Sequence, residues 1–188
     1  MQTKVLFTAD QIAVRVNQLA AEITADIDAD TRPVLVGVLK GSVTFLADLV
    51  RAMHVDPDVD FMSISAYSDG FAMSGVVKIV KDLESSLEAR DVIVVEDIVD
   101  TGLTLTYLLR TLQARGPRSL KVCALINKDV RRIAETPIDY QGFETEEFLV
   151  GYGLDFKGRY RNLPYLAAVD DVATLAAHPD ALNDVFWG

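Results

Sequence analysis

The stretch VIVVEDIVDTGLTLT, residues 92–106, decides the fold of this chain. Its first four residues are β-branched and apolar, which is typical of a buried strand. Two carboxylates, Glu96 and Asp97, stand where we expect that strand to end. From Leu103 the spacing of the apolar residues becomes helical. Because ligands of open α/β sheets bind at the carboxyl ends of strands, we expect a binding site at this strand-turn-helix unit.

The turn that joins the strand to the helix contains residues suited to a phosphate. Thr101, Gly102 and Thr104 are small or carry hydroxyls, and the helix start offers backbone N–H groups. Asp100 opens the turn and is the third acid within five residues. A phosphate beside three acids would be repelled unless a sugar separates the charges and a divalent cation neutralises them. The stretch therefore predicts a phosphorylated sugar bound together with magnesium.

The composition limits the class of protein. The chain has 188 residues, half of them hydrophobic, which fits a single domain with a sizeable core. Its 18 basic and 28 acidic residues give a net charge of −10, which argues against non-specific nucleic-acid binding. The one cysteine, Cys123, lies in an apolar run, so we expect a buried strand residue in a reducing compartment. Without a signal-peptide pattern or a membrane-length apolar run, we expect a cytoplasmic protein with no membrane partner.

Helix and strand signals alternate along the chain, which favours an α/β fold. Thr8 and Gln11 predict a capping box at the start of a first helix. A polar stretch, residues 66–75, is long for a tight hairpin and is a candidate mobile lid. We expect residues 129–145 to be irregular and the carboxyl terminus to contain a small helix. The other expected strands are residues 33–39, 59–65, 76–81, 120–126, 148–150 and 165–169, and a further helix follows the first of these.

Other classes of site share parts of the same pattern. A receiver domain also has paired acids, but it needs an aspartate at the end of the next strand, where this chain has Asn127 and Lys128. The glycine patterns of dinucleotide-binding and P-loop sites are absent from the sequence. A purely structural interpretation stays open, in which Glu96 and Asp97 are acids at a helix start and Thr101 is its cap.

The complete stretch 92–106 resembles the phosphoribosyl pyrophosphate (PRPP) motif of type I phosphoribosyltransferases. That motif has two apolar residues, two acids, two apolar residues, then Asp-Thr-Gly and a hydroxyl. The sequence VLKG at residues 38–41 resembles the pyrophosphate loop of the family. Two further segments resemble the hypoxanthine-guanine branch of the family. They are VDFM at 59–62 and FLVGYGLD at 148–155, the second followed by RYRNLPY at 159–165. The resemblance covers about residues 8–169.

The resemblance implies a fold and a reaction. The fold would be a mostly parallel sheet flanked by helices, in one domain of residues 1–188 whose amino- and carboxyl-terminal segments form a small hood. The reaction would belong to purine salvage and join a 6-oxopurine to PRPP. Purine N9 would attack C1 of the ribose while pyrophosphate leaves, giving IMP from hypoxanthine and GMP from guanine. Magnesium would be the cofactor, and the protein would be a homodimer or homotetramer.

The resemblance also assigns roles around the PRPP motif. Glu96 and Asp97 would hold the ribose hydroxyls and magnesium. Asp100 would lie near N7 of the purine as general base, since a purine that loses a proton is a better nucleophile. A helix N-cap is the structural alternative for Asp100. The residues that would wrap the 5′-phosphate are Asp100, Thr101, Gly102, Thr104 and Leu103, which replaces a lysine common in the family.

Pyrophosphate would be bound by Leu39, Lys40, Gly41 and Arg161. In the family the peptide that corresponds to Leu39–Lys40 can be cis, and the guanidinium of Arg161 suits bidentate binding. Without the resemblance, Lys40 and Gly41 would be interpreted as a plain turn and Arg161 as a surface charge.

The purine would be recognised by the carboxyl-terminal third of the chain. Lys128 would donate to O6, Phe148 would stack on the ring, and the backbone of Leu149 would contact the ring edge. Asp155 would contact the 2-position through its backbone and could bind a second magnesium. From the residues alone, Lys128 could equally be a solvated loop lysine and Phe148 a core residue.

The sequence departs from the family pattern in two places, the lid and the segment that precedes Phe148. The lid usually carries a Ser-Tyr pair, whereas this chain has Ala66 and Tyr67. Tyr67 would still close over the reacting atoms, without the serine hydroxyl. The segment 142–147, which leads to Phe148, is one residue shorter than usual and lacks a proline.

Two other functions are possible. A regulatory protein of the same fold could use PRPP or nucleotide binding to control attachment to RNA, but the net charge of −10 argues against the basic face that it needs. A transferase for another base, such as xanthine, would differ in contacts at the 2-position that the sequence does not reveal. His54 and His178 match no catalytic position, and we expect them to be structural.

Overall fold

The computed structural model describes residues 3–28, 31–69, 72–130 and 132–187, and within them the side chains of residues 66–77 are not described. In chain order the elements are β1 (Thr3–Phe7), α1 (Ala9–Asp26), β2 (Val34–Val38), α2 (Ser42–Ala52), β3 (Asp58–Asp69), β4 (Ala72–Lys81), β5 (Asp91–Val99), α3 (Leu103–Gln113), β6 (Ser119–Asn127), β7 (Tyr140–Glu144), β8 (Leu149–Val150), β9 (Leu166–Val169), α4 (Val172–Ala177) and α5 (Asn183–Trp187).

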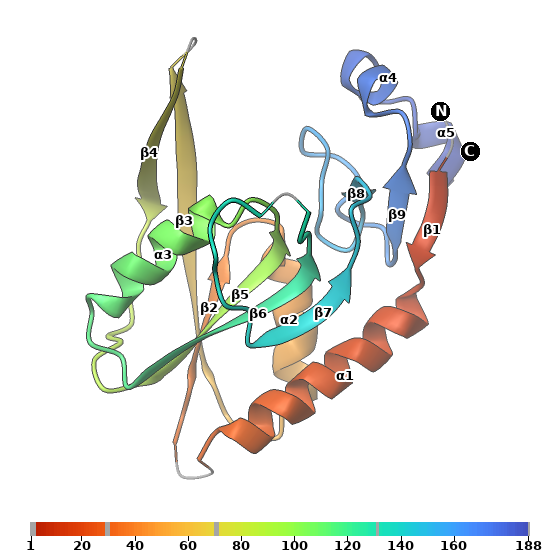
Figure 1. The fold of residues 1–188 in the computed structure, drawn as a ribbon. Coiled ribbons are helices and arrows are strands. Elements are labelled where there is room, and N and C mark those ends of the chain that lie inside the picture. Colours follow the sequence, from red (N-terminus) through yellow and green to blue (C-terminus); the bar gives the residue numbers. More distant parts are fainter. Residues whose placement is uncertain (1–2, 29–30, 70–71, 131, 188) are drawn as a thin grey trace.

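The main sheet has the order β4-β3-β2-β5-β6-β7, and all its pairs are parallel except β3 with β4. Helices α1 and α2 cover one face and α3 covers the other (Figure 1). Strand β5 contributes buried side chains to both faces of the sheet. Ile93 and Val95 belong to the core under α1 and α2, whereas Val92 and Val94 belong to the core under α3. The expected mostly parallel α/β sheet is confirmed.

Strand β5 is longer than the sequence predicted. It continues to Val99, which pairs with Asn127 of β6, so Glu96 and Asp97 lie inside the strand and not after it. The apolar run ends at residue 95, but the backbone of β6 keeps pairing beyond it. The two acids still lie in the carboxyl-terminal half of the strand.

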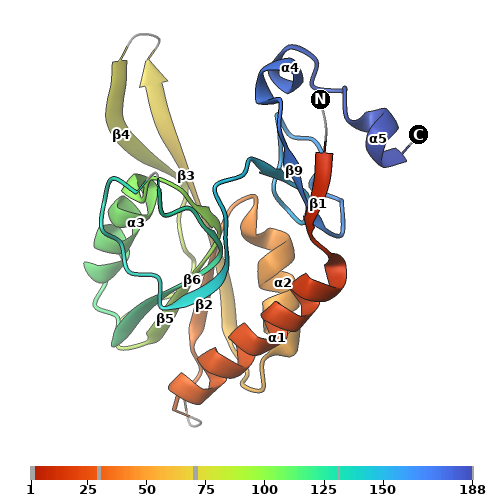
Figure 2. The same cartoon turned by 45° about the vertical axis from the view of Figure 1, so that its right-hand side comes forward.

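A second, three-stranded sheet joins the two ends of the chain. It has the order β1-β9-β8 with antiparallel pairs, and we call it the small sheet. Strand β1 was not predicted, because its alternation spans only five residues. Helices α4 and α5 follow β9. Figures 1 and 2 both show the β3–β4 hairpin projecting from the main sheet toward the end of the molecule where the small sheet lies, with the hairpin and the small sheet on opposite sides of the molecule.

The first helix has the predicted cap and core face. The Thr8 side chain accepts from the backbone of Gln11, and the Gln11 side chain accepts from the backbone of Thr8, which is the expected capping box. Ile12, Val16, Leu19 and Ile23 were predicted to form its apolar stripe, and all four are buried.

The segment 129–145 was predicted to be irregular, and this is wrong for β7. Its sequence, YQGFE, lacks a strand-like run, and Gly142 passes so close to β6 that a Cβ there would lie 2.3 Å from the Leu125 carbonyl oxygen. The guanidinium of Arg15 on α1 donates to the carbonyls of Gln141 and Gly142. Long-range pairing and this side-chain cap therefore stabilise a strand that local sequence does not indicate.

The stretch 66–75 was predicted to be a loop and is mostly strand. Strands β3 and β4 pair up to Asp69 with Ala72, so they form a long antiparallel hairpin. The side chain of Tyr67, the predicted lid residue, lies outside the described part of the structure.

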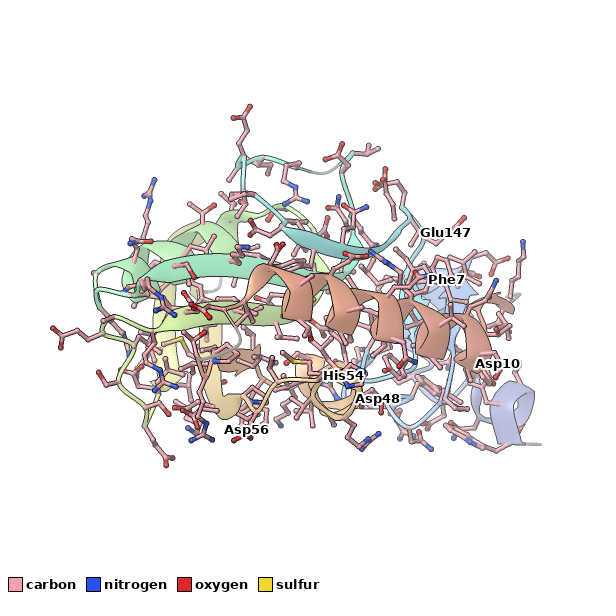
Figure 3. All side chains as sticks on the ribbon, turned by 90° about the horizontal axis from the view of Figure 1, so that it is seen from below. Phe7, Asp10, Asp48, His54, Asp56 and Glu147 are labelled. Carbon is pink, nitrogen blue, oxygen red and sulfur yellow. The ribbon has the colours of Figure 1, made fainter. Side chains whose placement is uncertain are left out.

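Three single-residue predictions concern positions away from the proposed site. Cys123 is buried in β6, as predicted, and burial raises the pKa of its thiol. His54 lies beyond the carboxyl end of α2, two residues after Ala52 (Figure 3). His178 ends α4. Among the described residues, none of the helices combines the length and the apolar character needed to span a membrane.

Candidate active site

A pocket of about 270 Å³ lies where the carboxyl ends of β2 and β5 meet the start of α3. It brings together predicted residues from two parts of the chain: Leu39 from the loop after β2, Glu96 from β5, and the turn before α3. We call residues 100–104 the phosphate turn. The lining residues are Val38, Leu39, Ile64, Glu96, Ile98, Val99, Asp100, Thr101, Gly102, Thr104 and Leu105. Ile64, from β3, was not predicted.

The acid pair, Glu96 and Asp97, lies in surroundings that disfavour two negative charges. Glu96 is 7% exposed, and burial together with the neighbouring Asp97 charge raises its pKa well above the ordinary value. Burial also raises the pKa of Asp97 to about 6, although the backbone N–H of Ile98 and the charge of Arg161 act in the opposite direction. The ionised acid pair would therefore be stabilised by a cation or by hydroxyl donors.

The phosphate turn overlaps the start of α3, whose first two residues, Leu103 and Thr104, belong to both. Gly102 precedes the helix in a left-handed conformation, with φ of 79°, which favours glycine. Asp100, the predicted general base, is the first residue of this turn and lines the pocket. Thr104 also lines it, whereas the Leu103 side chain is 47% exposed and is absent from the lining residues. Only the backbone of Leu103 is therefore suited to the predicted phosphate contact.

The loop after β2 packs on the acid pair. The Leu39–Lys40 peptide is cis, as the resemblance allowed. The N–H of Leu39 donates to the carbonyl of Met62 on β3, at 2.8 Å. Gly41 touches Asp97 so closely that a Cβ on this glycine would lie 1.4 Å from the Oδ2 atom. The predicted pyrophosphate loop and the acid pair therefore form one unit.

Arg161 connects the carboxyl-terminal part of the chain to the same unit. Its Nη1 donates to the carbonyl of Gly153 at 2.6 Å, and its Nη2 lies 2.6 Å from Oδ1 of Asp155. A Cβ on Gly153, which has φ of 97°, would lie 2.2 Å from the carbonyl oxygen of Gly41. Gly153 was not predicted, and its signal would have been the glycine between two bulky residues in the segment 148–155.

The predicted base-binding residues are spread over two elements. Lys128 follows β6, is 4% exposed, and its backbone N–H donates to the carbonyl of Val99 on β5 at 2.9 Å. Phe148 packs edge-on against Phe156, with ring centroids 5.8 Å apart, in the core of the small sheet. Leu149 is buried in β8. The described residues that line the 270 Å³ pocket include none of these three, and the predicted residues among them are those expected to bind PRPP.

The carboxylates present are compatible with magnesium. Among the described residues, the structure contains no cluster of three or more His, Cys, Asp or Glu side chains that could hold a metal ion. Magnesium is commonly held by one or two carboxylates together with substrate phosphates and water, so it needs no such cluster. The acid pair, whose pKa values are raised by burial, fits a site that a divalent cation completes.

Fold and site together define a class of protein. A mostly parallel sheet with an acid pair in the carboxyl-terminal half of a central strand, followed by a phosphate turn, is the arrangement expected of phosphoribosyltransferases. The family model of the phosphoribosyl transferase domain matches residues 2–157. The chain therefore belongs to the phosphoribosyltransferase family and is a transferase.

Relatives narrow the assignment within the family. The chain is 44% identical over 167 residues to the hypoxanthine-guanine phosphoribosyltransferase of Bacillus subtilis, covering 88% of this chain and 92% of that protein. The Mycobacterium avium protein of the same name is 46% identical over 172 residues, covering 88% and 85%. A crystal structure of the Bacillus anthracis hypoxanthine-guanine phosphoribosyltransferase has a TM-score of 0.84 at 40% identity, covering 89% and 98%. The chain is thus a member of the hypoxanthine-guanine phosphoribosyltransferases.

Proposed function

We propose that this chain transfers the 5-phosphoribosyl group from PRPP to hypoxanthine and guanine, giving IMP or GMP and pyrophosphate in purine salvage. The main observation that supports this proposal is that Gly41 packs on Asp97. The family to which the chain belongs agrees with it. This packing brings the loop expected to bind the leaving pyrophosphate against the acids expected to bind the ribose. Bond breaking at C1 needs both groups at adjacent positions.

The acid pair suits the charge that develops on the ribose. As pyrophosphate leaves C1, the ring becomes positively charged, and a site complementary to that state lowers the barrier. Glu96 and Asp97 would hold the ribose hydroxyls and add negative charge on this side. The Thr101 and Thr104 hydroxyls and the backbone of the phosphate turn would hold the 5′-phosphate, which keeps C1 in place.

The leaving pyrophosphate would be received by the loop of Leu39, Lys40 and Gly41 together with Arg161. The contacts of Arg161 with Gly153 and Asp155 hold its guanidinium beside this loop. A guanidinium can bind two phosphate oxygens at once, which suits a doubly phosphorylated leaving group.

Magnesium supplies charge neutralisation for pyrophosphate when it is bound. Glu96 and Asp97 are the residues that would hold it at the ribose. Asp155 is the candidate for a second ion, and its present contacts with Arg161 and the backbone N–H of Gly158 would have to change for that role.

The purine would be positioned and activated from the other side of C1. Asp100 would take a proton at N7, which makes the ring a better nucleophile. Lys128 would donate to O6, Phe148 would stack on the ring, and the backbones of Leu149 and Asp155 would contact its edge. Tyr67 on the β3–β4 hairpin would close over the site.

The proposal also includes an oligomeric state and a cellular location. We expect one domain of residues 1–188, assembled as a homodimer or homotetramer in the cytoplasm. The single, buried cysteine supports a reducing compartment. An RNA-attachment protein of this fold is a weaker alternative, because the net charge is −10.

A substrate panel tests the function. The protein is incubated with PRPP, magnesium and one base at a time, from hypoxanthine, guanine, xanthine, adenine and uracil, and nucleotide is measured by chromatography. We expect IMP and GMP, and loss of both when magnesium is chelated. Product from adenine or uracil alone, or no product from any base, would contradict the proposal, and product mainly from xanthine would reassign its substrate.

A further inference from the structure

Residues 132–136 contact the phosphate turn, and nothing in the sequence indicated these contacts. The backbone N–H groups of Ile133 and Ala134 both donate to the carbonyl of Thr101, at 3.0 and 3.1 Å. A carbonyl that accepts two hydrogen bonds has a fixed direction, so the peptide between Thr101 and Gly102 is fixed as well.

That orientation determines where the next N–H group points. The Thr101–Gly102 peptide is trans, and in a trans peptide the N–H points away from the C=O. The N–H of Gly102 therefore points away from Ile133 and Ala134. Arg132 and Thr136 of this segment line a different pocket from the one lined by Thr101 and Gly102, which agrees with this arrangement.

The hydroxyl of Thr136 makes the second connection. Its Oγ1 lies 3.0 Å from Oγ1 of Thr106 on α3 and 3.4 Å from the carbonyl oxygen of Gly102. Oγ1 of Thr106 donates to the same carbonyl at 2.9 Å. A Cβ on Gly102 would lie 2.9 Å from Oγ1 of Thr136, so the turn and this threonine are in direct contact.

We propose that Thr136 is a positioning residue for PRPP. Acting through Gly102 and Thr106, it holds the phosphate turn in the conformation that presents backbone N–H groups to the 5′-phosphate. This inference rests on the proposed function and deepens it, because Thr136 lies 30 residues beyond Thr106, the last residue of the PRPP motif that would bind the ligand.

A change of Thr136 to valine removes the hydroxyl and keeps the side-chain volume. We expect Thr136→Val to raise the KM for PRPP about 5- to 10-fold, as loss of one hydrogen bond in a binding loop would. The KM for hypoxanthine and kcat should change by less than about two-fold. Thr136→Ser keeps the hydroxyl and should restore the PRPP KM. Thr111→Val is the matched control, because the Thr111 hydroxyl also bonds a carbonyl on α3, that of Tyr107, away from the turn.

Several outcomes would overturn the inference. An unchanged PRPP KM in Thr136→Val, or an equal rise in Thr136→Ser or Thr111→Val, would show that the hydroxyl does not position the turn. If Thr136→Val does not fold, Thr106→Val removes the partner hydroxyl, and an unchanged PRPP KM there would be equally decisive. The proposed function fails in a different way, when the unaltered protein forms no nucleotide from PRPP.

Discussion

Gly41 and Asp97 are in contact across the site, and no side-chain carbon fits between them. A Cβ on Gly41 would lie 1.4 Å from Oδ2 of Asp97 and 2.4 Å from its Cγ. The φ of Gly41 is −63°, so space and not backbone conformation requires glycine here. Any larger residue would displace the carboxylate that we assign to the ribose and magnesium.

Gly41→Ala should therefore both destabilise the protein and weaken PRPP binding. Overpacking costs about 1–3 kcal/mol, and about 1 kcal/mol lowers Tm by roughly 2–4 °C in a chain of this size. We expect Tm, measured by calorimetry, to fall by about 5 °C. In an Asp97→Ala background the same change should cost much less, since the clashing atoms are gone. Equal losses in the two backgrounds would place the cause elsewhere.

Asp100→Asn tests the general base. The amide keeps the shape of the side chain and cannot take a proton, and general bases typically contribute about 10²–10⁴ in rate. We expect kcat to fall by about 100-fold or more, whereas the affinity for PRPP, measured by titration calorimetry, changes far less. Unchanged kcat would remove Asp100 from this role.

Lys128→Ala tests recognition of the purine. Hydrogen bonds to charged groups contribute about 1.5–3 kcal/mol, which corresponds to about 10- to 100-fold in affinity. We expect the KM for hypoxanthine to rise by this factor and the KM for PRPP to stay near its original value. Lys121→Ala is a suitable control, because Lys121 lies on β6, the strand that Lys128 follows, but bonds to Asp26 and Tyr140, away from the pocket. The reverse pattern of KM values would reject the assignment.

Asp91 predicts a pH dependence of stability outside the site. The side chain of Arg118 is the main cause that lowers the pKa of Asp91 from 3.8 to about 2, and Ser119 also donates to it. A carboxyl whose pKa is lower in the folded state stabilises the fold above its unfolded pKa, and this contribution disappears as pH falls toward the folded pKa. We therefore expect urea unfolding to show a stability difference between the native protein and Asp91→Asn that shrinks from about pH 4 to about pH 2. A difference that stays constant over this range would contradict the lowered pKa.

The sequence predicted structure that depends on neighbouring residues better than structure that depends on contacts between distant segments. The strand-turn-helix around the phosphate turn and the capping box of α1 depend on residues close together in sequence, whose patterns report their own structure. Strand β7 was mispredicted because its parallel partner, β6, stabilises it, whereas in the stretch 66–75 the strands β3 and β4 pair with each other up to Asp69 with Ala72. Long-range packing decided the contacts of Gly153 with Gly41 and of Thr136 with Gly102.

The sequence by itself therefore determined the α/β class, the position of the acid pair close before the turn that we expect to bind phosphate, and the family resemblance that names PRPP. Those features are encoded in short, contiguous patterns of side-chain type. Only the tertiary structure decided that Gly41 packs on Asp97, that Gly153 packs on Gly41, and that Thr136 contacts Gly102. Such contacts join segments tens of residues apart, and their distances depend on how the sheet and the crossing loops pack, which no single segment specifies.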